Sequence, residues 1–102
     1  MSKEIMRDCY SKQARMHKAL ANEARLMIID RLNSSEMSVG QITTEVGLDQ
    51  STISKHLAVL HSAGIVGNRR QGTNVFYCLH KHCIEDMVSD IKDILEHRHR
   101  RQ

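Results

Sequence analysis

The sequence predicts a mainly α-helical domain that carries one β-hairpin. The chain of 102 residues has no proline and no tryptophan, and it is rich in residues that favour helices. Apolar residues recur at steps of three and four over most of the chain, and the pattern becomes strand-like after residue 64. A chain of this length buries one core, so residues 1–102 are expected to form a single domain.

Two helices are expected at the N-terminus. Over residues 3–18 the apolar side chains recur at helical spacing. Asn22 is a favourable N-cap residue for a second helix, which is expected to run to Arg31 or Leu32. The polar residues 33–35 then interrupt the helical pattern.

A short third helix is expected after this break. Ser38 and Gln41 have the spacing of a capping box, in which two side chains satisfy free amides at a helix start. The helix is expected to end near Val46, because Gly47 can adopt the left-handed conformation that often follows a helix.

A fourth helix follows almost immediately. Asp49 or Ser51 can cap its start, and the helix is expected to run to about Ala63, before Gly64. Two helices joined by so short a turn predict a helix-turn-helix over residues 38–63.

The strand-like part of the sequence predicts a hairpin over residues 65–79. Apolar residues at 65–66 and 75–77 flank the segment 69–74, whose turn contains a glycine. A last helix is expected from about residue 81 to residue 96, followed by a basic tail at 98–102. The expected order is therefore helix, helix, helix, helix, strand, strand, helix.

The distribution of charge indicates a surface for nucleic acid. No acidic residue occurs between residues 50 and 78. One face of the fourth helix is apolar, and the opposite face carries small hydroxyls and a lysine. Such a face can enter a major groove, although a solvated face is the common alternative. His56, at the border of the apolar face, is expected to be a partly buried structural residue. The predicted DNA-contacting residues are Gln50, Ser51, Thr52, Ser54, Lys55, Arg69, Arg70 and Thr73.

These motifs resemble a known family. The segments 20–26, 48–57, 63–66, 69–72 and 75–77 are similar to the ArsR/SmtB family of bacterial transcriptional repressors. The resemblance covers roughly residues 18–79. It implies a winged helix-turn-helix homodimer, not an enzyme, that occupies a double-stranded operator and releases it when an inducer binds.

An apolar seam on the last helix predicts dimerisation. Its residues follow 4-3-4 spacing, which suits pairing with another helix: Ile84, Val88, Ile91 and Leu95. The family dimerises through its first and last helices, here residues 1–20 and 81–97. A two-fold dimer predicts a palindromic operator. The alternative is a monomer in which the seam packs on the first helix.

The inducer is expected to be a metal ion or a metalloid. The resemblance places one well-known zinc site of the family on Lys81, Cys83, Ile94 and His97, and two of these have no ligand chemistry. Cys83 and His97 are separated by about 21 Å along one helix. In an antiparallel pair, however, Cys83 of one chain would face His97 of the other. Thiolate and imidazole suit zinc, nickel, cobalt or copper.

The alternative sensor uses thiols alone and no metal. Cys9, Cys78 and Cys83 are an odd number of cysteines in a chain without a secretion signal, so reduced thiols are expected. Cys9 near Cys78 or Cys83 could bind a metalloid such as trivalent arsenic, or could oxidise and so form a redox or reactive-sulfur sensor. Each cysteine could instead be a small buried apolar residue.

Two further readings of the sequence carry less weight. A dimeric module without DNA binding leaves the arginines of the hairpin unexplained. A small thiol enzyme or metal carrier would need an activated cysteine, and the sequence has no CxxC motif. The longest apolar run, at residues 26–29, is too short to cross a bilayer, so a cytoplasmic protein is expected.

Overall fold

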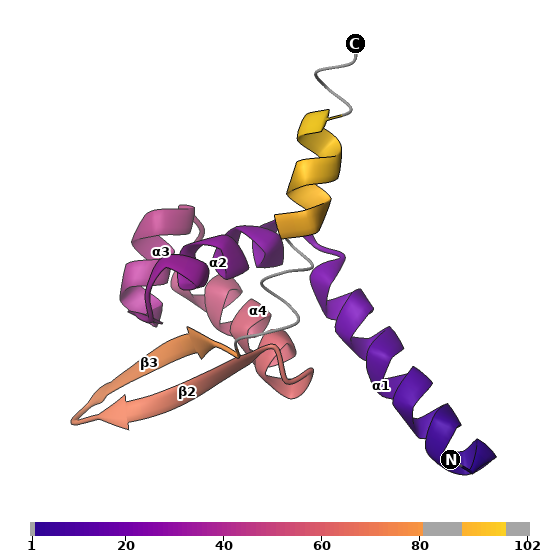
Figure 1. Cartoon of the computed structure of the whole chain (residues 1–102). Coiled ribbons are helices and arrows are strands. Elements are labelled where there is room, and N and C mark those ends of the chain that lie inside the picture. The colour runs from indigo at the N-terminus through magenta and orange to yellow at the C-terminus, as the bar shows by residue number, and fades with distance from the viewer. Residues whose placement is uncertain (1, 81–88, 98–102) are drawn as a thin grey trace.

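The computed structural model describes residues 2–80 and 89–97. Figure 1 shows a helical body from which one long hairpin projects. Residues 89–97 are also helical, whereas the start of the predicted last helix lies outside the described residues. The elements are α1 (Lys3–Leu20), α2 (Glu23–Ser34), β1 (Met37–Ser38), α3 (Val39–Val46), α4 (Gln50–Ser62), β2 (Val66–Gln71) and β3 (Asn74–Leu79). The predicted mainly helical fold with a β-hairpin is confirmed.

The predicted helix caps of α2 and α3 are present. Asn22 Oδ1 accepts a hydrogen bond from the Arg25 amide at 3.1 Å. At α3 the capping box is complete: Ser38 Oγ accepts from the Gln41 amide at 3.2 Å, and Gln41 Oε1 accepts from the Ser38 amide at 2.9 Å. Gly47 ends α3 with φ of 82°, the left-handed conformation that its lack of a side chain permits.

The start of α4 is fixed by one of the two expected candidates. Asp49 is the N-cap, and its Oδ1 accepts from the Thr52 amide at 2.8 Å. Ser51 lies in the first turn of the helix and does not cap it. The turn between α3 and α4 is therefore short, and the two helices form the predicted helix-turn-helix.

The sheet has one strand more than the sequence predicts. β1 pairs antiparallel with β3, and β3 pairs antiparallel with β2, in the order β1-β3-β2. β1 spans only Met37 and Ser38, opposite Tyr77 and Phe76. Two residues are too few to give an alternating pattern, and the strand exists because the free edge of β3 supplies its partner.

The turn of the hairpin is short and contains the predicted glycine. The two strands are paired out to Gln71 and Asn74, so only Gly72 and Thr73 form the turn. Gly72 has φ of 62°. Arg69 and Arg70 lie near the end of β2, beside the predicted glycine-containing turn.

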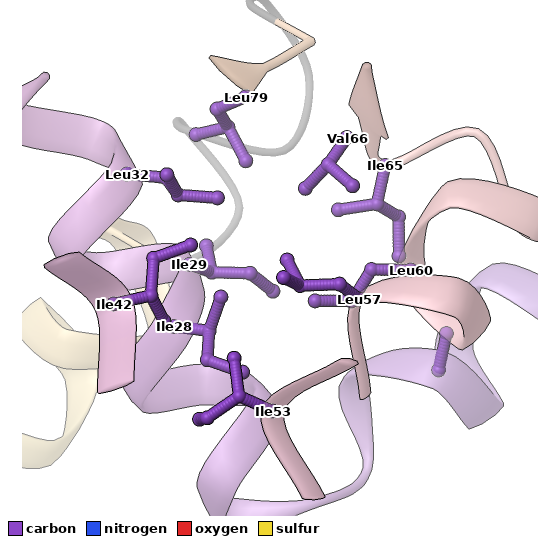
Figure 2. Close-up of a cluster of buried hydrophobic side chains, with 11 residues drawn as sticks. Ile28, Ile29, Leu32, Ile42, Ile53, Leu57, Leu60, Ile65, Val66 and Leu79 are labelled. Carbon is purple, nitrogen blue, oxygen red and sulfur yellow. The ribbon is translucent and has the colours of Figure 1, made fainter. Parts of the chain in front are cut away.

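The core holds α4 against the rest of the body. Figure 2 shows side chains from α2, α3, α4 and the base of the hairpin converging on one cluster. Ile53, Leu57 and Leu60 of α4 are fully buried in it. Burial of a side chain of this size contributes about 1.5–3 kcal/mol. Because these three residues share one face of α4, the opposite face is turned to solvent.

The two terminal helices stand away from this core (Figure 1). Of α1, only Ala19 is buried, whereas its N-terminal half exposes Ile5, Met6 and Tyr10. Residues 89–97 are exposed throughout, including Ile91 and Leu95 at 51% and 57%. The described half of the apolar seam is thus uncovered within one chain, while Ile84 and Val88 lie outside the described residues.

An ion pair connects residues 89–97 to α2. Lys92 Nζ lies 2.5 Å from Asp30 Oδ1 of α2. Across residues 2–80 and 89–97, no helix is long and apolar enough to span a membrane.

Candidate nucleic-acid interface

The outer face of α4 presents polar side chains that have no side-chain partner in the described part of the chain. Gln50, Ser51, Ser54 and Lys55 are exposed. None of these four side chains makes a hydrogen bond or an ion pair with another described residue. They lie in the first two turns of α4, where free backbone amides and the helix dipole also favour an anion. This face can donate to base edges and to phosphates.

Thr52 differs from its neighbours because it belongs to the cap. Its Oγ1 donates to Asp49 Oδ2 at 3.0 Å, and the residue is half-buried. The backbone amide of Thr52, and then its hydroxyl, lower the pKa of the Asp49 carboxyl. Thr52 therefore stabilises the start of α4, and its hydroxyl proton is already donated to Asp49.

The two arginines of β2 have different surroundings. Arg70 is exposed and has no side-chain partner among the described residues, and the same is true of Thr73 in the turn. Arg69 donates through Nε to Glu36 Oε1 and Oε2 at 3.0 and 3.1 Å, and through Nη2 to Oε1. Its Nη1 donates to Gln71 Oε1 at 3.0 Å.

A ring contact completes the surroundings of Arg69. The guanidinium lies 4.9 Å from the ring centroid of Phe76, its cross-strand partner in β3. The hydrogen bonds with Glu36 raise the pKa of Arg69 and lower the pKa of the Glu36 carboxyl. Arg69 therefore ties the hairpin to the segment before β1, whereas Arg70 is the free cation of this strand.

His56 lies at the border of the buried face, as predicted. It is half-buried, and its Nδ1 is 3.3 Å from Nη1 of Arg25. Burial, and then the positive charge of Arg25, lowers the pKa of the imidazole. The expectation of a partly buried, hydrogen-bonded residue is confirmed.

The predicted sensing residues are not brought together within the described part of the chain. Cys9 is exposed on α1, and Cys78 is half-buried in β3; both are free thiols. His97 is exposed at the end of the last described stretch, and Cys83 lies outside the described residues. Over residues 2–80 and 89–97, no group of three or more His, Cys, Asp or Glu side chains could hold a metal ion. A metal site of that size would therefore need residues outside the described part of the chain or residues of a second chain.

Sequence reasoning missed two residues near this surface. Glu36 binds Arg69 across 33 positions, and Arg25 contacts His56 across 31 positions. No local periodicity links residues so far apart. Arg25 lies within the segment 20–26 that carries the family resemblance, which was the single signal that pointed to it.

A helix-turn-helix with an open polar face, followed by a basic hairpin, defines the class of winged helix-turn-helix DNA-binding proteins. The chain belongs to the ArsR family of bacterial regulatory proteins, whose family model matches residues 22–67. It is a transcriptional regulator with a DNA-binding helix-turn-helix, and not an enzyme.

Two relatives show the extent of the similarity. The transcriptional activator HlyU of Vibrio cholerae is 36% identical over 86% of this chain and 82% of its own length. The biofilm growth-associated repressor of Xylella fastidiosa is 37% identical over 78% of this chain and 69% of its own length.

Solved structures agree with this assignment. A homodimeric winged helix-turn-helix DNA-binding domain from Mycobacterium bovis, a possible ArsR-family regulator, superposes with a TM-score of 0.90 at 29% identity, covering 100% of this chain and 94% of that domain. The transcriptional repressor BigR from Xylella fastidiosa gives a TM-score of 0.77 at 33% identity, covering 92% of this chain and 96% of BigR.

Proposed function

We propose that the protein is a homodimeric repressor that places α4 in the major groove of a palindromic operator. The observation that carries this proposal is the set of unpartnered donors on the outer face of α4, at Gln50, Ser51, Ser54 and Lys55. Amide and hydroxyl side chains suit base edges, and Lys55 suits a phosphate or guanine. Arg70, exposed on the hairpin, adds a phosphate contact outside the groove that α4 occupies.

The dimer of the proposal forms through α1 and the C-terminal helix. Ile5, Met6 and Tyr10 on α1, and Ile91 and Leu95 on the C-terminal helix, are exposed in the single chain. A second copy would cover these apolar side chains. The similar domain from Mycobacterium bovis is described as homodimeric, which supports the same assembly here. Ile84 and Val88 are proposed to extend the interface.

The experiment that tests DNA binding removes two cations from the proposed interface. Lys55→Ala combined with Arg70→Ala is compared with Lys3→Ala combined with Arg7→Ala, which removes the same charge from the exposed N-terminal end of α1, at a protein concentration where both variants are shown to be dimers. We expect the first pair to weaken binding to DNA from upstream of the gene, in fluorescence anisotropy, far more than the second pair. Equal affinities for wild type and the Lys55/Arg70 variant would contradict the proposal.

The proposed inducer is a metal ion or metalloid held by Cys83 of one chain and His97 of the other. The support is the chemistry of a thiolate and an imidazole, and the position of exposed His97 on the helix proposed for the interface. Binding between subunits would favour one dimer geometry and so change the affinity for DNA.

A thiol sensor is the second candidate, and specific observations favour it. Cys9 is an exposed free thiol on α1, and Cys78 is a second free thiol. A similar solved structure is described as reduced HlyU from Vibrio cholerae, with a TM-score of 0.76 at 34% identity over 89% of this chain and 96% of that one. Oxidation of thiols would then replace metal binding as the event that releases DNA.

One titration separates the two candidates. Operator release is measured with a panel of metal ions in the presence of reductant, and with an oxidant or polysulfide in the presence of a chelator. Release in the first arm that is lost in Cys83→Ser and His97→Ala supports the metal site. Release in the second arm that is lost in a cysteine variant supports the thiol sensor. A protein that releases DNA in neither arm has no inducer of these two classes.

A further inference from the structure

Arg25 links three helices through one side chain. It lies in the first turn of α2, where its amide is fixed by the Asn22 cap. Its Nε donates to the Ala19 carbonyl at 2.6 Å, and its Nη2 lies 3.4 Å from the Lys18 carbonyl, both in the last turn of α1. Its Nη1 lies 3.3 Å from Nδ1 of His56 on α4.

These contacts have no counterpart elsewhere in the described structure. Over residues 2–80 and 89–97, they are the only side-chain hydrogen bonds that join α1 to another helix. In the same part of the chain, the contact with His56 is the only side-chain hydrogen bond from α4 to another helix or strand. The helix proposed for the dimer interface and the helix proposed to read DNA therefore share one polar connection.

Direct packing between α1 and α4 is incomplete. A groove of about 440 Å³ runs between them. Its walls include Arg15 and Lys18 of α1, Arg25 of α2, and Ala58 and Val59 of α4. Among the described residues, α1 contacts the core through buried Ala19 and the partly buried Met16 and Leu20. Because little apolar contact fixes the angle between α1 and α4, the hydrogen bonds of Arg25 to both helices are placed to constrain that angle.

The chemistry of the contact suits a rigid connection. The last carbonyls of a helix have no partner within it, and they carry the negative end of its dipole, so a guanidinium is a favourable neighbour. The planar guanidinium holds its N–H groups in a fixed fork. On the α4 side, a neutral imidazole with an unprotonated Nδ1 accepts from Nη1, and burial and the charge of Arg25 both lower the pKa of His56 and so favour that neutral form.

We propose that Arg25 is a positioning residue that couples the orientation of α1 to that of α4. A change in how α1 packs against the partner chain, or a modification of Cys9 on α1, then changes the orientation of the DNA-reading helix. This inference rests on the proposed function, because it requires a dimer that binds an operator through α4.

The test is a double-mutant cycle on Arg25 and His56. Arg25→Met keeps a long side chain without the hydrogen bonds, and His56→Phe keeps a ring of similar size. Arg15→Met is the matched control: Arg15 lies on α1 beside the same groove and has no side-chain partner among the described residues. Operator affinity, affinity for unrelated DNA, the dimer dissociation constant and the melting temperature are measured for each variant.

The coupling predicts a specific combination of results. Arg25→Met lowers operator affinity by roughly tenfold, within the range of measured couplings between sites. Its affinity for unrelated DNA and its dimer dissociation constant stay at the wild-type values, because no phosphate contact and no interface residue is lost. The double variant loses no more operator affinity than the weaker-binding single variant, because both changes break the same contact. Arg25→Lys, which keeps the charge without the fork, does not restore binding.

Several results would overturn the inference. Wild-type operator affinity in Arg25→Met, or losses that add fully in the double variant, would show that the contact does not position α4. A lower melting temperature with unchanged operator affinity would make Arg25 a stability residue only. If Arg25→Met does not fold, the operator affinity of His56→Phe tests the inference instead, because this variant breaks the same contact from the α4 side. If the wild type itself binds no operator, the proposed function fails instead.

Discussion

The two arginines of β2 differ in surroundings, and this difference predicts unequal roles on DNA. Arg70 is free, whereas Arg69 is held by Glu36, Gln71 and the ring of Phe76. The perturbation is therefore Arg70→Ala on the one hand, and Arg69→Ala combined with Glu36→Ala on the other. The second variant removes a pair of opposite charges and leaves the net charge of the hairpin region unchanged.

The expected magnitude follows from counterion release. Each phosphate that the protein neutralises steepens the plot of log affinity against log salt by about 0.9. A dimer has two hairpins, so Arg70→Ala is expected to reduce the slope by about 1.8. Between 50 and 200 mM salt, this change means that the wild type loses about 12-fold more affinity than the variant. The Arg69/Glu36 variant is expected to keep the wild-type slope while binding more weakly at every salt concentration, because the hairpin is less firmly held.

The assay is fluorescence anisotropy with a labelled operator duplex at a series of salt concentrations, with the dimer confirmed at each one. A wild-type slope for Arg70→Ala would refute the assignment of Arg70 to a phosphate. If the Arg69/Glu36 variant reduces the salt slope as much as Arg70→Ala does, Arg69 must leave Glu36 and bind a phosphate in the complex.

Three further predictions concern stability, each measured by urea denaturation at one fixed protein concentration. Leu57→Ala, at a fully buried site in the core, is expected to lower the free energy of unfolding by about 2–5 kcal/mol, and a loss well below that range would mean that the core closes around the cavity. Ser38→Ala removes the capping-box hydrogen bond that the Ser38 hydroxyl accepts, and it is expected to lower the free energy of unfolding by about 1 kcal/mol. An unchanged free energy of unfolding would contradict the role of Ser38 as a cap. The free energy of unfolding is expected to fall as the pH drops below about 6.5, because the lowered pKa of His56 means that the unfolded chain binds the proton more readily. His56→Gln should reduce this pH dependence, whereas the control His61→Gln should not. If the free energy of unfolding falls with decreasing pH equally in both variants, the dependence belongs to other groups.

Local signals in the sequence were sufficient for most of the fold. The capping box at Ser38 and Gln41, the left-handed Gly47 and the alternatives for the cap of α4 each depend on residues within four positions of one another. Interactions between residues this close in the chain can be recognised from the spacing of residue types in the sequence. The buried stripe of α4 is equally local, because residues three and four apart share a helix face.

Contacts between distant residues could not be predicted in this way. β1 is a strand because β3 lies beside it, and its two residues carry no pattern of their own. The pairing of Arg69 with Glu36 depends on where the sheet places the segment before β1, so the sequence predicted two equivalent arginines. The connection from Arg25 to His56 likewise depends on the packing of α2 against α4.

In the candidate site, too, the features that depend on nearby residues were predicted and those that depend on distant contacts were not. The outer face of α4 follows from helical periodicity, and the structure exposes Gln50, Ser51, Ser54 and Lys55 there. Thr52 was grouped with them because helix position alone does not reveal that its hydroxyl serves the Asp49 cap. The sensing residues stay a prediction, since Cys83 lies outside the described residues and the proposed Cys83–His97 site needs a second chain.

The most direct test of DNA reading by α4 is an NMR titration of the isotope-labelled dimer with an operator duplex. The account predicts that the backbone amide signals of the first two turns of α4, including Ser51, Ser54 and Lys55, shift most. Signals of Arg70 and Gly72 in the hairpin should shift as well, while those of the core residue Ile42 stay in place. Shifts confined to regions outside α4 and the hairpin, or no shifts with DNA that the protein is shown to bind, would contradict the claim.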